Sequence, residues 1–306
     1  MPVTHFRSVS RLESGANVAL LAPAGPLQKP DELPRAQENT RTLGWEPIVG
    51  AHASDRFGYL AGSDRDRLND LNGALRDPKI DAIWCLRGGY GMTRLLDNVD
   101  YETLSKSPKA IIGYSDITAL HAAVQRRCKI ITYHGPTARE QLSDFSRDSF
   151  ERALVKQTDS CGTAPAAREL NAGAAEGRLV GGNLSVLAAL CGTPFAPDYS
   201  DSILILEDVN EPVYRIDRML QQLRLTGTLN GCRAIVFGDC TSCPEDAGGG
   251  GRSFDDVLGE LAHGLGVPCL AGIPVGHISE QWTIPLGAMA RVDTKSRTLA
   301  VTSYKS

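Results

Sequence analysis

The chain has 306 residues, 42% of them hydrophobic and 22% charged, an ordinary composition for a globular protein with one large or two smaller domains. Its 32 basic and 36 acidic residues give a formal net charge of −4 and are interspersed along the sequence, so there is no basic stripe to neutralise phosphates or anionic lipids. We therefore expect neither nucleic acid nor a membrane surface as a partner.

The N-terminal segment and the cysteines indicate the compartment. Residues 1–17 contain no apolar core of signal-peptide length, and no later segment approaches a membrane span, which predicts a cytoplasmic protein. The eight cysteines are scattered, as expected for reduced buried thiols. Cys240-x-x-Cys243 lacks a second ligand pair and a thioredoxin-like context, so packing in a loop is favoured over a redox or metal role.

The first half alternates short apolar runs with helical patterns. Predicted strands cover residues 17–22, 46–49, 82–86, 110–112 and 130–133, and predicted helices cover residues 30–43, 65–76, a stretch beginning at 92, and 117–126. A repeated order of strand, glycine-containing turn and helix is typical of a parallel sheet flanked by helices. In such sheets the functional loops follow the carboxyl ends of the strands.

The second half has a different pattern. Residues 158–174 are rich in Thr, Ala, Gly and Pro without clear periodicity and are interpreted as a linker. Residues 202–206 and 234–237 resemble strands, 214–225 an amphipathic helix, and 288–292 with 298–302 a hairpin. The predicted fold is α/β: a parallel-sheet domain of Rossmann or flavodoxin type over residues 1–157, then the linker, then a smaller α+β domain over residues 175–306.

The segment Gly113-Tyr-Ser115-Asp116 lies where a strand should turn sharply into a helix. Ser115 would then stand at the tip of the turn, beside helix N–H groups that favour developing negative charge, which is the position of a nucleophile. The usual elbow has glycine two residues after the serine, and here Ile117 takes that place. The alternative is that Ser115 or Asp116 only caps the helix.

A second glycine-rich turn, Arg87-Gly-Gly-Tyr-Gly91, also follows a predicted strand. Its unobstructed backbone N–H groups suit an oxyanion hole or a phosphate cradle. It does not match the full dinucleotide-binding pattern, and such glycine pairs are common in plain turns.

Candidate partners for the serine lie in the second half. Glu207 directly follows an apolar run and could orient a histidine, whereas Asp208 and Glu211 could be solvated loop acids or helix caps. His277 lies in a loop shaped by glycine and proline, and His134, at the end of a strand, is a second candidate base.

Five motifs occur together in this chain: residues 86–91, residues 113–116, Gly181-Gly-Asn183, residues 206–208 with Asn210-Glu211, and Gly276-His277. In this order and spacing they resemble the LD-carboxypeptidases, also called muramoyltetrapeptide carboxypeptidases, from about Ala19 to the C-terminus. The resemblance implies a triad of Ser115, Glu207 and His277 between an N-terminal domain with the serine and a C-terminal domain with the other two. It also implies a cytoplasmic homodimer that removes the terminal D-alanine from murein tetrapeptides, and this mechanism requires neither a cofactor nor a metal.

These residues can be given roles in acyl transfer. His277 would take the proton from Ser115 and later return it to the departing D-amino acid, while Glu207 holds the imidazole. The oxyanion would meet backbone N–H groups of the turn containing Gly88 and Gly89 and of Asp116, whose side chain would cap or brace the loop. The free carboxylate of the substrate needs a cation, and the candidates are Arg87, Arg94 and Arg215.

Two other functions are considered. Microcin-immunity peptidases use the same triad on peptidyl-nucleotides, but they have a longer insertion before the glutamate than the stretch from Asn183 to Glu207 allows. A non-catalytic nucleotide- or sugar-binding protein would use the glycine turns for phosphate and Ser115 as a cap. That second alternative lacks a Walker lysine and leaves Glu207 and His277 unexplained.

Overall fold

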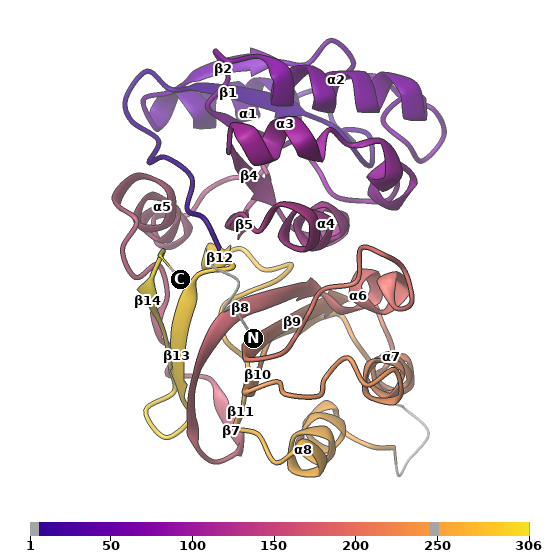
Figure 1. Cartoon of the computed structure of the whole chain (residues 1–306), viewed down its shortest axis with the longest axis vertical. Coiled ribbons are helices and arrows are strands. Elements are labelled where there is room, and N and C mark those ends of the chain that lie inside the picture. Colours follow the sequence, from indigo (N-terminus) through magenta and orange to yellow (C-terminus); the bar gives the residue numbers. More distant parts are fainter. Residues whose placement is uncertain (1–5, 245–250, 306) are drawn as a thin grey trace.

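The computed structural model describes residues 6–244 and 251–305, which form two sheets stacked along the long axis of the molecule (Figure 1). The first sheet has the strand order β12-β5-β4-β3-β1-β2, and the second has the order β6-β14-β13-β8-β9-β10-β11-β7. No helix in the described part of the chain has the length and apolar character that crossing a bilayer requires.

The first sheet is built from short, mostly buried apolar strands. Its strands are β1 (Asn17–Leu21), β2 (Glu46–Val49), β3 (Ala82–Cys85), β4 (Ala110–Gly113), β5 (Thr132–His134) and β12 (Ile284–Leu286). The first five run parallel, and β12 joins β5 antiparallel. The carboxyl ends of β1 to β5 therefore meet at one edge of the sheet.

Helices flank this sheet, and those that begin at Glu32, Asp64 and Thr118 lie where the sequence pattern predicts them. The helix expected from residue 92 is replaced by two short helical turns and a helix that begins at Tyr101, and the helix that begins at Asp144 was not predicted. The helices are α1 (Glu32–Thr42), α2 (Asp64–Arg76), α3 (Tyr101–Lys106), α4 (Thr118–Cys128) and α5 (Asp144–Glu151), with short helical turns at Met92–Arg94, Leu96–Asn98, Ser115–Ile117 and Arg152–Lys156. Ser63 accepts a hydrogen bond from the Asp66 N–H at 3.2 Å and so caps the start of α2. In Figure 1, α4 lies between the two sheets.

The second sheet is mixed. Its strands are β6 (Gly162–Thr163), β7 (Arg168–Asn171), β8 (Ala174–Asn183), β9 (Ser202–Val209), β10 (Ala234–Thr241), β11 (Cys269–Ala271), β13 (Met289–Asp293) and β14 (Thr298–Ser303). Strands β8 to β11 are parallel, and β13 and β14 form an antiparallel pair, as the predicted hairpin requires. Helices α6 (Leu184–Leu190), α7 (Val213–Leu225) and α8 (Phe254–Leu265) complete this part.

The predicted fold class is confirmed: a mostly parallel N-terminal sheet is followed by a mixed C-terminal sheet. The segment 158–174, expected as a linker, contains β6 and β7, and both are paired into the second sheet. In the other direction, β12 crosses into the first sheet. The division at residues 157 and 175 stays a prediction.

The junction between the sheets positions the start of α4. The N–H of Asn183, at the end of β8, donates to Thr118 Oγ1 at 3.0 Å. A Cβ at Gly182 would lie 2.5 Å from the same Thr118 oxygen, so only glycine permits this approach. The chain just after Ser115 is thereby tied to the strand beside Glu207.

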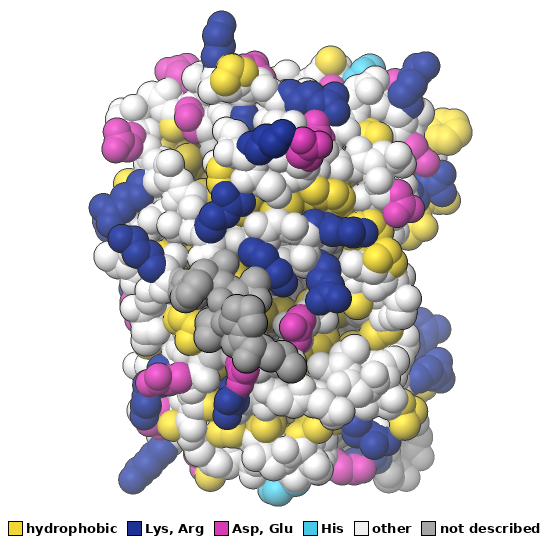
Figure 2. Space-filling model, in the orientation of Figure 1, with side chains coloured by type: hydrophobic (Ala, Val, Ile, Leu, Met, Phe, Trp, Pro, Cys, Tyr) yellow, Lys and Arg dark blue, Asp and Glu magenta, His cyan; other side chains and the backbone are white. Residues whose placement is uncertain are grey.

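Charged side chains are spread over the face shown in Figure 2, with Lys and Arg grouped near its middle, over the junction of the two sheets. At this junction the charged groups of Arg178 and Lys129 lie 5.4 and 5.5 Å from the centroid of the Phe6 ring. Both distances suit cation–π contacts, which attach the N-terminal segment to both parts of the chain.

Candidate active site

Ser115 occupies a strained position at the edge of the first sheet. Strand β4 ends at Gly113, and Ser115 then adopts a φ of +62°, a conformation that residues with side chains rarely take. A short helical turn and α4 follow immediately. The strand, strained turn and helix present the Ser115 side chain at the carboxyl edge, as in a nucleophile elbow. The glycine turn packs closely here, since a Cβ at Gly88 would lie 2.7 Å from Ser115 Cβ.

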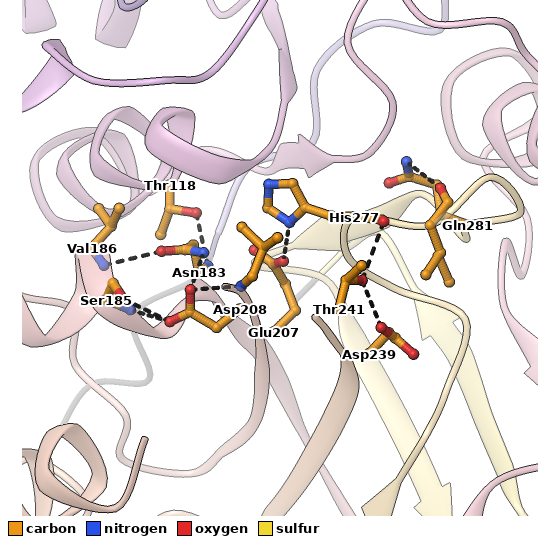
Figure 3. Close-up of polar contacts among 12 residues, drawn as sticks. Thr118, Asn183, Ser185, Val186, Glu207, Asp208, Asp239, Thr241, His277 and Gln281 are labelled. Carbon is orange, nitrogen blue, oxygen red and sulfur yellow. Dashed lines mark hydrogen bonds and ion pairs between the residues drawn. The ribbon is translucent and has the colours of Figure 1, made fainter. Parts of the chain in front are cut away.

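Glu207 and His277 come from separate elements and meet across the second sheet. Glu207 lies in β9 and is fully buried, and His277 lies in the loop after β11. Nδ1 of His277 is 2.9 Å from Glu207 Oε2, the contact drawn at the centre of Figure 3. Gly276 has a φ of +121°, and a Cβ there would come within 3.2 Å of that Glu207 oxygen.

Burial and pairing act in opposite directions on this pair. Burial raises the pKa of Glu207 above its ordinary value, although the hydrogen bond from His277 opposes the shift. For His277, burial alone would lower the pKa, but the hydrogen bond and charge of Glu207, with Glu140 and Asp208 further off, raise it above its ordinary value. The imidazolium form of His277 is therefore stabilised in place.

Asp208, the neighbour of Glu207, braces the site. Its carboxylate accepts hydrogen bonds from Ser185 N at 2.9 Å, Ser185 Oγ at 2.7 Å and Asn183 Nδ2 at 3.2 Å (Figure 3). Asn183 Oδ1 in turn accepts from Val186 N at 3.2 Å and caps α6. Asp208 is thus a buried structural acid that fixes the end of β9 rather than a solvated loop residue.

Ser115 and His277 open into one cavity of about 260 Å³. Its lining consists of Arg87, Gly88, Gly89, Tyr114, Ser115, Thr137, Arg139, Glu140, Val209 and His277. Residues from the ends of β3, β4, β5 and β9 and from the loop after β11 are brought together. The structure thereby gathers the predicted serine, histidine, glycine turn and Arg87 around one space.

Asp116 has a different place. Its side chain is buried, and Asp116 Oδ2 accepts the Met92 N–H at 2.8 Å. Burial raises the pKa of Asp116 to about 6. The carboxyl group therefore links the glycine turn to the strand-to-helix turn of Ser115.

The backbone of the glycine turn is held from one side. Gly25 N–H donates to the Gly88 carbonyl at 2.8 Å, and Gly89 has a φ of +93° with its Cβ position 3.1 Å from Gly25 Cα. Within the described chain, the N–H groups of Gly88 and Gly89 donate to no protein acceptor. Free N–H groups packed against a serine side chain suit an anionic oxygen.

The three candidate arginines differ in the groups with which they pair. Arg94 forms a bidentate pair with Asp64, and Arg215 pairs with Glu211 at 3.4 Å. Arg87 donates only to the Pro26 carbonyl, at 2.9 Å, and has no carboxylate partner among the described residues. Burial lowers the pKa of Arg87. Arg87 is the one of the three that lines the cavity.

Arg139 and Glu140 were not predicted. Arg139 pairs with the buried carboxylate of Glu32. Glu140 accepts a hydrogen bond from Thr137 Oγ1 at 2.6 Å and another from Gln281 at 3.3 Å, and burial raises its pKa. Both residues follow β5, and polar residues after a fifth parallel strand are the signal that could have found them.

His134, the second candidate base, is enclosed. It is fully buried, its ring packs 5.9 Å from the Tyr114 ring centroid, and neither ring nitrogen has a partner in the described structure. Burial lowers its pKa to about 3. His134 does not line the cavity, so the geometry favours His277 as the base.

Comparisons with known proteins agree with this architecture. Residues 18–135 match the LD-carboxypeptidase N-terminal domain, and residues 176–292 match the LD-carboxypeptidase C-terminal domain. The chain is 35% identical to the probable murein peptide carboxypeptidase of Bacillus subtilis, with 95% of this chain and 92% of that protein covered. It is 37% identical to the murein tetrapeptide carboxypeptidase of Pseudomonas aeruginosa, with 89% and 92% covered.

Solved structures show the same fold. The muramoyltetrapeptide carboxypeptidase from Oxalobacter formigenes has a TM-score of 0.83 at 30% identity, covering 94% of this chain and 98% of that one. The microcin C7 self-immunity protein MccF has a TM-score of 0.88 at 24% identity, covering 96% and 98%. Both family domains and relatives above 30% identity span this chain, which therefore belongs to the LD-carboxypeptidase (peptidase S66) family of hydrolases.

Proposed function

We propose that this protein is a serine carboxypeptidase that cleaves the L,D peptide bond releasing the terminal D-alanine from murein tetrapeptides. The observation that carries the proposal is the cavity in which Ser115 and His277 meet, with Glu207 behind the imidazole at 2.9 Å. A nucleophile, a base and an orienting carboxylate in this order make an acyl-transfer triad. The names of the relatives support murein peptides as the substrate class.

The reaction follows from these groups. His277 Nδ1–H donates to Glu207, which leaves Nε2 to accept the Ser115 hydroxyl proton as Oγ attacks the carbonyl carbon. The tetrahedral intermediate collapses when His277 returns that proton to the amine of the departing D-alanine. Water, deprotonated by the same imidazole, then hydrolyses the acyl-serine and restores Ser115.

The oxyanion is assigned to backbone N–H groups. Those of Gly88 and Gly89 have no acceptor among the residues that the structure describes, and the Asp116 N–H directly follows the nucleophile in the chain. Losing one such donor typically costs about 3 kcal/mol of transition-state stabilisation. Ser115, in its strained conformation with positive φ, places Oγ 3.0 Å from the Cβ position of Gly88, beside these N–H groups.

The free carboxylate of the substrate is assigned to Arg87. Its guanidinium lines the cavity without a carboxylate partner in the described structure, whereas Arg94 and Arg215 are already paired. A charged donor in a partly buried site gains more from an anion than an exposed one does. Arg139, already paired with Glu32, adds positive charge nearby.

The test is D-alanine release from L-Ala-γ-D-Glu-meso-diaminopimelate-D-Ala by the parent and by Ser115→Ala, Glu207→Ala and His277→Ala. Removing a nucleophile or base from a triad can lower kcat by about a millionfold. Release by the parent alone supports both the reaction and the triad. An inactive parent contradicts the proposal and favours a peptidyl-nucleotide substrate, a possibility in keeping with the MccF-like fold.

Cytoplasmic location and a homodimer are part of the same proposal. Both come from the family resemblance. Sedimentation of the purified protein would measure the oligomeric state, and a monomer at all concentrations would contradict the dimer.

A further inference from the structure

Two tyrosine rings stand exposed beside the cavity. Tyr59 is 68% exposed and Tyr90 is 48% exposed, and their ring centroids lie 5.6 Å apart with planes inclined at 65°. Tyr133 and Tyr199, by contrast, are buried in the cores, and Tyr214 is exposed on α7 away from any other tyrosine ring among the described contacts. Tyr59 and Tyr90, here called the tyrosine pair, therefore contribute little to the folded core.

The tyrosine pair lies on the same sheet edge as the nucleophile. Along this edge the loops after β4, β3, β1 and β2 follow one another, because the strand order is β4-β3-β1-β2 and all four strands are parallel. Tyr90 directly follows Gly89 of the cavity lining, and Tyr59 belongs to the loop after β2. The cavity and the tyrosine pair thus form neighbouring parts of one edge.

Backbone contacts hold the loop of Tyr59. Phe57 and Leu60 exchange two hydrogen bonds of 2.8 and 3.0 Å, which close the turn that contains Tyr59. Ala61 N–H donates to the Ala24 carbonyl at 2.9 Å, so this loop is attached to the loop after β1. The tyrosine is presented by a closed turn and not by a free strand end.

Charged groups beneath the pair fix the neighbouring loops. The buried Arg67 donates to the carbonyls of Pro23 and Gly91 and pairs with Asp64 at 2.6 Å. Asp64 also holds the half-exposed Arg94 in a bidentate pair. Exposing two adjacent aromatic rings to water costs hydration free energy without a folding benefit, and an exposed apolar patch of this kind suits a binding surface.

We propose that the tyrosine pair binds the sugar ring at the amino end of a murein peptide. This inference rests on the proposed function. The cut bond lies at the carboxyl end of the substrate, and three extended residues span roughly 10 Å, so the sugar must lie outside the cavity. A sugar ring offers a C–H face to an aromatic ring and hydroxyl groups at its edge, and the Arg94–Asp64 pair supplies donors and acceptors beside the rings.

The experiment compares two substrates that differ only in the sugar. D-Alanine release is measured from the free tetrapeptide and from the same peptide carrying N-acetylmuramic acid. The parent should show a kcat/KM about tenfold higher on the sugar-bearing substrate, a gain of the size that aromatic contacts provide. Tyr59→Ala with Tyr90→Ala should abolish this preference and leave the free-peptide value within about twofold. Leu225→Ala, which removes another exposed apolar side chain, should change neither value.

A binding measurement separates this inference from the proposed function. Saturation-transfer NMR with N-acetylmuramic acid should show contacts with the parent and with Ser115→Ala but not with the double tyrosine variant, whether or not any peptide is cleaved. Equal kcat/KM on both substrates in the parent, or equal losses on both in the double variant, would overturn the inference. So would a shift from dimer to monomer in sedimentation of the double variant, because the pair would then be an interface between copies.

Discussion

His277 Nδ1 lies 2.9 Å from Glu207 Oε2, although the two residues are 70 positions apart and lie in separate elements. Glu207 is placed by a strand whose register with β8 and β10 is fixed over several residues. His277 is placed by a loop in which Thr241 Oγ1 lies 3.2 Å from the His277 carbonyl oxygen (Figure 3). The pair is therefore held by the second sheet, and the nucleophile by the first.

Glu207→Gln should disable the triad while preserving its shape. The amide can present its N–H to the imidazole and trap the wrong tautomer, and a comparable change in a serine protease triad lowers kcat by about 10⁴. We expect a loss of several thousandfold in kcat for D-alanine release, with the thermal unfolding midpoint changed by only a few degrees. Retention of a tenth or more of the parent activity would mean that Glu207 does not orient His277.

Glu140→Gln should alter the pH profile more than the maximal rate. Glu140, Glu207 and Asp208 all contribute negative charge that raises the pKa of His277, whereas the nearby His134 is neutral in this pH range because burial lowers its pKa to about 3. Removing one negative charge lowers the pKa of His277, so the neutral base persists to lower pH. The acidic limb of kcat/KM should therefore move to lower pH.

The pH profile has a matched control. Glu102→Gln removes an exposed carboxylate of α3 that does not face His277 and should leave the limb in place. An acidic limb that moves to higher pH in Glu140→Gln, or equal shifts in both variants, would contradict the role assigned to Glu140.

Arg87→Ala should discriminate between substrates with and without a free carboxylate. If its unpaired guanidinium binds the terminal carboxylate, kcat/KM should fall by about 100-fold on the free tetrapeptide and far less on its C-terminal amide. Arg215→Ala serves as control, because that exposed arginine already pairs with Glu211. Equal losses on both substrates would assign Arg87 a structural role instead.

The sequence is informative where local pattern decides the structure. Apolar runs locate β1 to β5 of the first sheet but not β12, which joins it from the second half of the chain. The strand-to-helix turn at Ser115 is predicted from its glycine and serine. The polar strands β6 and β7 are short, so residues 158–174 show no periodicity that predicts them. The predicted fifth strand could have pointed to Arg139 and Glu140, which follow it, but the loop that carries them has no glycine-rich motif to mark them as cavity residues.

Gly88→Ala tests how closely the glycine turn must approach the nucleophile. If nothing moved, the added methyl would lie 2.7 Å from Ser115 Cβ, 3.0 Å from Ser115 Oγ and 3.1 Å from the Tyr114 carbonyl oxygen. The turn or the serine must shift, and a displacement near 1 Å can cost about 100-fold in rate. We expect such a loss in kcat with folding retained.

Gly259→Ala is the matched control. Gly259 lies in α8 with open space at its Cβ position, so the variant should keep full activity and its unfolding midpoint should rise slightly. Full activity in Gly88→Ala would show that the turn does not shape the oxyanion site.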